Sequence, residues 1–131
     1  MKLAIDSSAI VAIFLKEPEA EALWHILRGA QVAQVCAASI LETQMVLSRR
    51  YPDGGANAID KFIADQKLII VPFDGNLLAI ARTAFLKYGK GRHPAGLNFG
   101  DCLAYALAKS MRLPLLFKGD DFALTDIERA V

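Results

Sequence analysis

Long apolar runs, repeats and linkers are all absent from this sequence. No stretch reaches the roughly 18 consecutive apolar residues that indicate a membrane span, and no segment is repeated or of low complexity. The apolar run at the start ends at Asp6 and is too short for the core of a signal peptide. With 131 residues, the chain has the length of one domain. We therefore expect a single domain over residues 1–131, located in the cytoplasm and without contact to a membrane.

An excess of charge of one sign is absent, and cysteine is scarce. Lys and Arg number 15 against 14 Asp and Glu, a formal net charge of +1, whereas general polyanion-binding proteins are strongly basic. The two cysteines, Cys36 and Cys102, lack the spacing of a metal site, and we expect both to be reduced thiols. Apolar residues make up 54% of the chain and charged residues 22%, which excludes a disordered tail. The composition indicates a folded domain that can still carry a local basic patch.

Strand-like and helical segments alternate along the chain. Short apolar runs predict strands at residues 2–5, 34–37, 68–71 and 113–117. Between them, helical periodicity and capping signals predict pairs of helices at residues 7–14, 18–29, 39–50, 56–66, 76–88 and 98–111. The run 68–71 is wholly apolar, which is typical of a strand buried on both faces. This order favours parallel strands with helical crossovers. We predict an α/β fold: a three-layer α/β/α domain with a mostly parallel central sheet of four to five strands.

Five acidic residues follow the predicted strands directly or lie in the first turn of a predicted helix. They are Asp6, Glu42, Asp101, Asp120 and Asp121. Ligands of parallel sheets bind beyond the carboxyl ends of the strands, so we expect these carboxylates to be drawn to one rim. Clustered carboxylates raise one another's pKa unless a cation lies among them. Oxygen ligands without nearby His or Cys suit Mg²⁺, with Mn²⁺ as an alternative, and such ions hydrolyse phosphodiesters.

Two of these acids also fit an ordinary structural role. Ser39 with Glu42, and Asn98 with Asp101, have the spacing of a helix capping box. Acids in a first helical turn are in any case stabilised by the helix dipole. Asp6 is harder to explain in this way, because it ends a buried strand and enters an apolar segment, where an unpaired charge is costly. For Glu42 and Asp101 both roles stay open, and they are compatible.

Four motifs follow one another along the chain. They are residues 6–12 (DSSAIVA), Glu42, residues 100–108 (GDCLAYALA) and residues 115–122 (LLFKGDDF). In this order and at these separations they resemble the motifs of PIN-domain ribonucleases, and more narrowly those of VapC toxins of bacterial type II toxin–antitoxin pairs. The resemblance covers essentially the whole chain, including residues 88–98 and 125–127.

This resemblance implies a magnesium-dependent endoribonuclease toxin. It further implies RNA as the substrate, a cognate VapB-like antitoxin that neutralises the toxin, and a homodimer. Asp6 and Asp101 match the principal metal ligands of the family, and Glu42 matches its third acid. Ser8 matches a small hydroxyl residue that orients a metal-bound carboxylate.

The fourth acid of the family has two candidate counterparts in this sequence. Many PIN domains have an acid two residues before an Asp–Phe pair, and here that position is Gly119. Asp120 and Asp121 both remain candidates, and one of them can be a cap of the turn that follows. We favour Asp121, because it is the acid of the Asp–Phe pair.

RNA binding needs positive charge, which the sequence concentrates in one loop. Residues 89–96 are rich in Gly and basic residues and lead toward Asp101. We therefore expect Lys90 and Arg92 of this loop to contact the phosphate backbone.

The main alternative is a small α/β signalling or phosphotransfer module of the receiver type, which also gathers acids at a sheet edge. Such a module needs an acid pair after the first strand and a phosphorylatable Asp after a central strand. Here Asp6 is single, and Asp74, after the third predicted strand, is the only candidate for the second position. Labelling of Asp74 by a phospho-donor would support this alternative.

Overall fold

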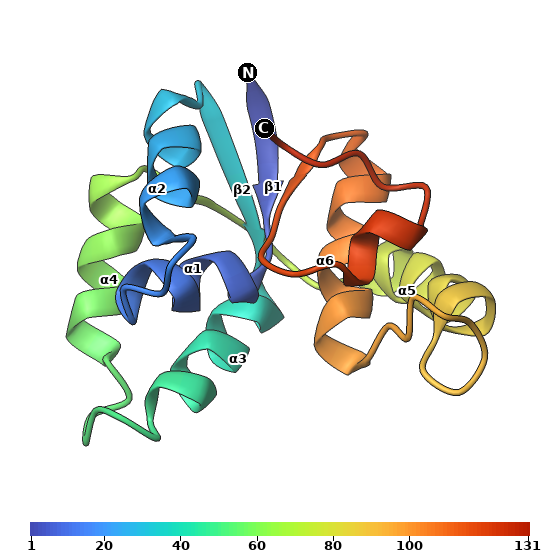
Figure 1. Ribbon diagram of the computed structural model, residues 1–131, viewed down its shortest axis with the longest axis horizontal. Coiled ribbons are helices and arrows are strands. Elements are labelled where there is room, and N and C mark those ends of the chain that lie inside the picture. The colour runs from blue at the N-terminus through green and yellow to red at the C-terminus, as the bar shows by residue number, and fades with distance from the viewer.

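The computed structural model describes all 131 residues and contains the expected order of strands and helices (Figure 1). The elements are β1 (Lys2–Ile5), α1 (Ser7–Phe14), α2 (Ala20–Gly29), β2 (Val32–Cys36), α3 (Ala37–Leu47), α4 (Ala56–Asp65), β3 (Ile69–Val71), α5 (Gly75–Tyr88), α6 (Phe99–Met111), β4 (Leu115–Leu116) and the 3₁₀ helix η1 (Asp121–Leu124). The four strands pair in parallel in the order β3-β2-β1-β4. The predicted three-layer fold with a parallel sheet is therefore confirmed. No helix is both long and apolar enough to cross a membrane.

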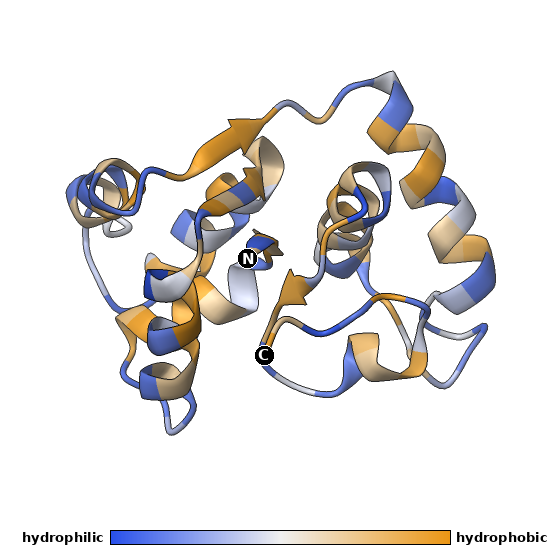
Figure 2. Cartoon of the chain, turned by 90° about the horizontal axis from the view of Figure 1, so that it is seen from above, coloured by the Kyte–Doolittle hydropathy of each residue, from blue (hydrophilic) through white to orange (hydrophobic).

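The strands supply alternate residues to two hydrophobic cores, one on each face of the sheet. Leu3 and Ile5 of β1 belong to the core formed with α1, α2 and α4, whereas Ala4 belongs to the core formed with α5 and α6. This alternation follows from the two-residue period of a strand. Figure 2 shows hydrophobic strands between helices that carry both hydrophobic and hydrophilic residues.

The prediction that the run 68–71 is buried on both faces is wrong. β3 is an edge strand, and the side chains of Ile69 and Ile70 are 48% and 46% exposed. An apolar run indicates a strand but does not reveal its place in the sheet, which depends on contacts distant in sequence.

Two features of the fold set the position of the acids. Helix α6 packs against β1, β2, α3 and α5, so its first turn lies near the carboxyl ends of the central strands. Both chain termini lie toward the opposite end of the sheet: Met1 precedes β1, and the backbone N–H of Ala130 donates to the carbonyl of Leu115 at the start of β4 (Figure 1). The rim with the acids thus lies at the end of the sheet away from both termini.

Candidate active site

Asp6 lies where β1 ends and α1 begins. Its Oδ2 accepts from the backbone N–H of Ser8 at 3.1 Å, so Asp6 is the N-cap of α1. The residue is only 3% exposed, and its other oxygen, Oδ1, is buried without a hydrogen-bond partner. Burial raises the pKa of Asp6 to about 7; the charges of Asp101 and Glu42 add to this effect, and the hydrogen bonds from Ser8 oppose it. A buried carboxylate oxygen of this kind needs a proton or a cation.

Glu42 lies in the second turn of α3 and not in its first turn. The helix follows β2 without a loop, with Cys36 at the N-cap, so the predicted capping box of Ser39 and Glu42 is wrong. Instead, Glu42 Oε1 accepts from Ser7 Oγ at 2.8 Å, across 35 positions of sequence. Glu42 is thereby held beside Asp6. Sequence reasoning missed Ser7, although its position directly after Asp6 was a signal.

Gly100 allows the carboxylate of Glu42 to lie against the first turn of α6. A Cβ built at Gly100 would be 1.9 Å from Glu42 Oε2, which is far shorter than any real contact. Only a residue without a side chain fits between this backbone and the carboxylate. Glu42 is therefore in contact with the residue that precedes Asp101.

Asp101 has both a capping role and a place among the acids. Its Oδ2 accepts from the backbone N–H of Asn98 at 3.0 Å, and Asn98 Oδ1 accepts from the backbone N–H of Asp101 at 2.9 Å. The predicted capping box of α6 is thus confirmed. Burial raises the pKa of Asp101 to about 6; the hydrogen bond from Asn98 opposes this, and the charges of Asp121 and Glu42 add to it.

The two acids that follow β4 are both exposed. Asp121 is the first residue of η1, and its charge raises the pKa of Asp101. Asp120 is exposed, precedes η1 and makes no side-chain capping hydrogen bond. The charges of Glu42 and Asp101 thus act on Asp6, and that of Asp121 acts on Asp101; the choice of Asp121 over Asp120 as the fourth acid stays a prediction.

The donor set fits a hard divalent cation, although it does not form a closed ligand shell. No three His, Cys, Asp or Glu side chains converge closely enough to enclose an ion. Three of the acids are each held by a hydrogen bond from a different residue. These pairs are Asp6 with Ser8, Glu42 with Ser7, and Asp101 with Asn98. The four carboxylates also repel one another. The unpartnered Oδ1 of Asp6 and the all-oxygen donor set match the preference of Mg²⁺ and Mn²⁺.

Ser8 ties the start of α1 to the end of β4. Besides the bond from its backbone N–H to Asp6, its Oγ accepts from the backbone N–H of Lys118 at 3.1 Å. The ammonium group of Lys118 in turn pairs with Glu17 and lies 3.7 Å from Glu19 Oε2. The backbone N–H of Ser8 thus contacts Asp6, and the effect of its hydroxyl group on a metal-bound carboxylate stays a prediction.

Backbone contacts join the two ends of the loop that carries Lys90 and Arg92. Gly89 and Leu97 form a parallel bridge, and the backbone N–H of Lys90 donates to Leu97 O at 3.0 Å. Lys90 and Arg92 are exposed, and Arg92 Nε donates to Leu86 O at 3.1 Å. The loop ends at Asn98, the N-cap of α6. It thus leads directly into the helix turn that carries Asp101.

Two hollows of the surface lie away from the carboxylates. One, of about 600 Å³, is lined by residues of α1, α2 and α4, including Phe14, Trp24 and Phe62. The other, of about 430 Å³, lies between α5 and α6 and includes Phe85 and Phe99. None of the four acids lines either hollow.

Comparison with known proteins assigns the family. The family model of the PIN domain matches residues 3–128. The chain belongs to the PIN domain family. A relative named "Ribonuclease VapC", from Mycolicibacterium smegmatis, is 44% identical over 125 residues, which are 95% of this chain and 97% of that protein. The resemblance of this PIN domain to the VapC ribonucleases is therefore confirmed.

Solved structures agree with the fold. The crystal structure of Mycobacterium tuberculosis VapC20, a sarcin-ricin loop cleaving toxin, matches with a TM-score of 0.76 and 15% identity, over 96% of both chains. A chain of a toxin–antitoxin complex from Klebsiella pneumoniae matches with a TM-score of 0.71 and 16% identity, over 95% of this chain and 93% of that one.

The receiver alternative finds no support in this PIN domain. Asp74 follows the edge strand β3 and caps α5, because its Oδ1 accepts from the backbone N–H of Leu77 at 3.0 Å. Its carboxylate thus has an ordinary structural role.

Proposed function

We propose that this PIN domain is a metal-dependent endoribonuclease toxin of the VapC type, which hydrolyses phosphodiester bonds of RNA in the cytoplasm. The observation that supports it most is the buried, unpartnered Oδ1 of Asp6, with the charges of Glu42 and Asp101 acting on the same residue. The 44% identity to a VapC ribonuclease, over nearly the whole of both chains, adds to it.

The acidic residues have distinct roles in this proposal. Asp6 and Asp101 would hold Mg²⁺, or Mn²⁺ in its place, and Glu42 and Asp121 would complete the acidic group. Bound there, the cation would supply an activated water and would neutralise charge on the phosphate. Ser7 orients Glu42 through its hydroxyl group. The chain thus contributes mainly fixed positions for charged groups.

The test replaces single carboxylates with their amides. Asp6→Asn or Asp101→Asn should abolish Mg²⁺-dependent cleavage of RNA, while the circular-dichroism spectrum and the melting temperature stay near those of the wild type. Asp65→Asn is a matched control, because Asp65 lies on the exposed side of α4 in an ion pair with Lys61. Full cleavage by either site variant, or cleavage in excess EDTA, would contradict the proposal.

The loop of residues 89–97 is the proposed contact with the RNA backbone. Lys90 and Arg92 are exposed there, and the loop leads into the turn that carries Asp101. Lys90→Ala combined with Arg92→Ala should weaken RNA binding and reduce the slope of log K against log salt by about one to two. An unchanged slope would reject the loop as the backbone contact.

A VapB-like antitoxin is the proposed protein partner. A chain of a toxin–antitoxin complex shares this fold, and an uncompensated group of carboxylates favours a basic side chain of a partner. A coexpressed VapB-like antitoxin should copurify with this chain and inhibit cleavage. Copurification without inhibition would mean that the partner does not cover the acids.

A homodimer is the second proposed assembly. Large apolar side chains are exposed on α3, α5 and α6, among them Met45 (64%), Leu86 (63%) and Phe99 (80%). Leu86 and Phe99 line one hollow between α5 and α6, and a contiguous apolar surface is typical of a protein interface. Light scattering should give the mass of a dimer for the wild type and of a monomer for Leu86→Glu. A monomeric wild type would contradict this assembly.

A further inference from the structure

The segment that carries Asp121 is too short to hold its position alone. η1 has four residues near the end of the chain, and 3₁₀ hydrogen bonds of this kind are weak. η1 packs against α6, the helix that carries Asp101, and Asp121 is the exposed first residue of η1. Contacts outside η1 must therefore fix its position.

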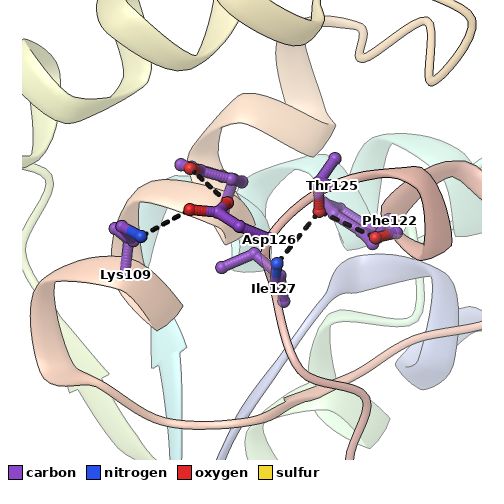
Figure 3. Close-up of polar contacts among 6 residues, drawn as sticks. Lys109, Phe122, Thr125, Asp126 and Ile127 are labelled. Atoms are coloured by element: carbon purple, nitrogen blue, oxygen red, sulfur yellow. Dashed lines mark hydrogen bonds and ion pairs between the residues drawn. The ribbon is translucent and has the colours of Figure 1, made fainter.

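Apolar and local contacts account for part of this. Phe122 is buried, and its ring centroid lies 5.0 Å from that of Phe117. Thr125 Oγ1 donates to Phe122 O at 2.7 Å and accepts from the backbone N–H of Ile127 at 3.2 Å (Figure 3). The Thr125 bonds are internal to the segment and fix its shape. The apolar contact has no preferred direction, so neither fixes where Asp121 points.

Asp126 supplies the directional contact with α6. Its Oδ1 accepts from Tyr105 Oη at 2.7 Å, and its Oδ2 accepts from Lys109 Nζ at 2.5 Å (Figure 3). Tyr105 is 5% exposed, so its hydroxyl group depends on this partner. Burial alone would raise the pKa of Asp126, but the hydrogen bonds from Lys109 and Tyr105 hold it below its ordinary value. Asp126 is therefore charged at neutral pH and binds its segment to α6.

The partners of Asp126 lie on the same helix as Asp101. Tyr105 follows Asp101 by four residues, which places the two side chains one turn apart on one face of α6. Helix α6 thus carries Asp101 at its start and the partners of Asp126 further along.

We propose that Asp126 is a positioning residue for the carboxylate site, because its bonds to Tyr105 and Lys109 hold the segment 121–126 on α6 so that Asp121 faces Asp101. This inference rests on the proposed function, since it concerns the geometry of the metal-binding acids. Asp126 acts through Asp121 and does not itself contact the cation.

The experiment measures Mn²⁺ affinity by isothermal titration calorimetry and, separately, the Mg²⁺ concentration for half-maximal RNA cleavage. Asp126→Asn should weaken both about tenfold, the lower end of the effect expected for residues that orient metal ligands. Tyr105→Phe removes only the hydroxyl group and keeps the buried ring. It should also weaken Mn²⁺ affinity and raise the Mg²⁺ concentration needed for half-maximal cleavage. Asp65→Asn breaks the exposed 2.7 Å ion pair with Lys61 and should change neither value.

A double-mutant cycle separates positioning from general destabilisation. In an Asp121→Asn background, Asp126→Asn should cause no further loss of Mn²⁺ affinity, because the carboxylate that it positions is already gone. Equal losses of Mn²⁺ affinity from Asp126→Asn in both backgrounds would overturn the inference. Wild-type Mn²⁺ affinity in both Asp126→Asn and Tyr105→Phe would overturn it as well. In either case, RNA cleavage by the wild-type protein would leave the proposed function intact. A wild-type protein that neither binds Mn²⁺ nor cleaves RNA would overturn both.

Discussion

Replacing Gly100 with Ala would place a methyl group against the carboxylate of Glu42. The added Cβ would lie 1.9 Å from Glu42 Oε2, whereas ordinary contact begins at 3.4 Å, so the carboxylate would have to move by roughly 1.5 Å. A movement of this size would break the 2.8 Å hydrogen bond from Ser7 Oγ. Because a misplacement of about 1 Å can cost on the order of 100-fold in rate, we expect a loss of that size in RNA cleavage.

The fold should tolerate this substitution. The displaced atoms are the far end of a flexible side chain, and a Gly→Ala change in a helix favours folding by about 0.4–1 kcal/mol where no strain results. We expect the melting temperature of Gly100→Ala to stay within about 5 °C of the wild type. Gly75, the first residue of α5, is the matched control, because nothing lies within 4 Å of a Cβ built there. Gly75→Ala should keep wild-type cleavage.

A shorter acid provides the decisive comparison. Glu42→Asp withdraws the carboxylate by one methylene group, so it should restore part of the cleavage rate in the Gly100→Ala background although it lowers the rate on its own. Wild-type cleavage by folded Gly100→Ala would refute the place of Glu42 in the active site.

Three further predictions concern the other acids and Ser7. Between pH 4 and pH 7, Asp6 keeps its proton in the folded state and loses it in the unfolded state, because its folded pKa of about 7 exceeds the ordinary 3.8. The free energy of unfolding without metal should therefore fall as the pH rises through this window, by up to about 4 kcal/mol. Thermal melts should show stabilisation by Mg²⁺ at pH 8 and little at pH 5, and equal stabilisation at both would contradict this. Asp121→Asn should lower Mn²⁺ affinity in calorimetry, whereas Asp120→Asn should not; the reverse order would make Asp120 the fourth acid. Ser7→Ala removes the hydrogen bond to Glu42 and should lower the cleavage rate about tenfold at unchanged melting temperature, and wild-type cleavage would count against an orienting role.

The sequence was sufficient to predict the fold and the local positions of Asp6 and Asp101. Asp6 could be predicted because a buried strand ends there, and Asp101 because its spacing from Asn98 is that of a capping box, a purely local pattern. The order of strands and helices followed from hydrophobic periodicity, which is also local. These features depend on residues within one or two helical turns of each other.

What the sequence did not reveal depends on contacts distant in the chain. The pattern at Ser39 and Glu42 suggested a cap, but β2 continues into α3 without a loop, so that pattern lies inside the helix. The bond from Ser7 to Glu42 spans 35 positions, and the anchoring of Asp126 by Tyr105 spans 21. Local spacing carries no information on either contact.

Both ends of the chain lie at the far side of the sheet from the acids. An affinity tag, a fluorophore or a surface linker can therefore be joined to Met1 or to Val131 without covering the carboxylates. Immobilised through either terminus, the protein would present its whole rim to RNA, so kinetic measurements on a chip and in free solution should agree.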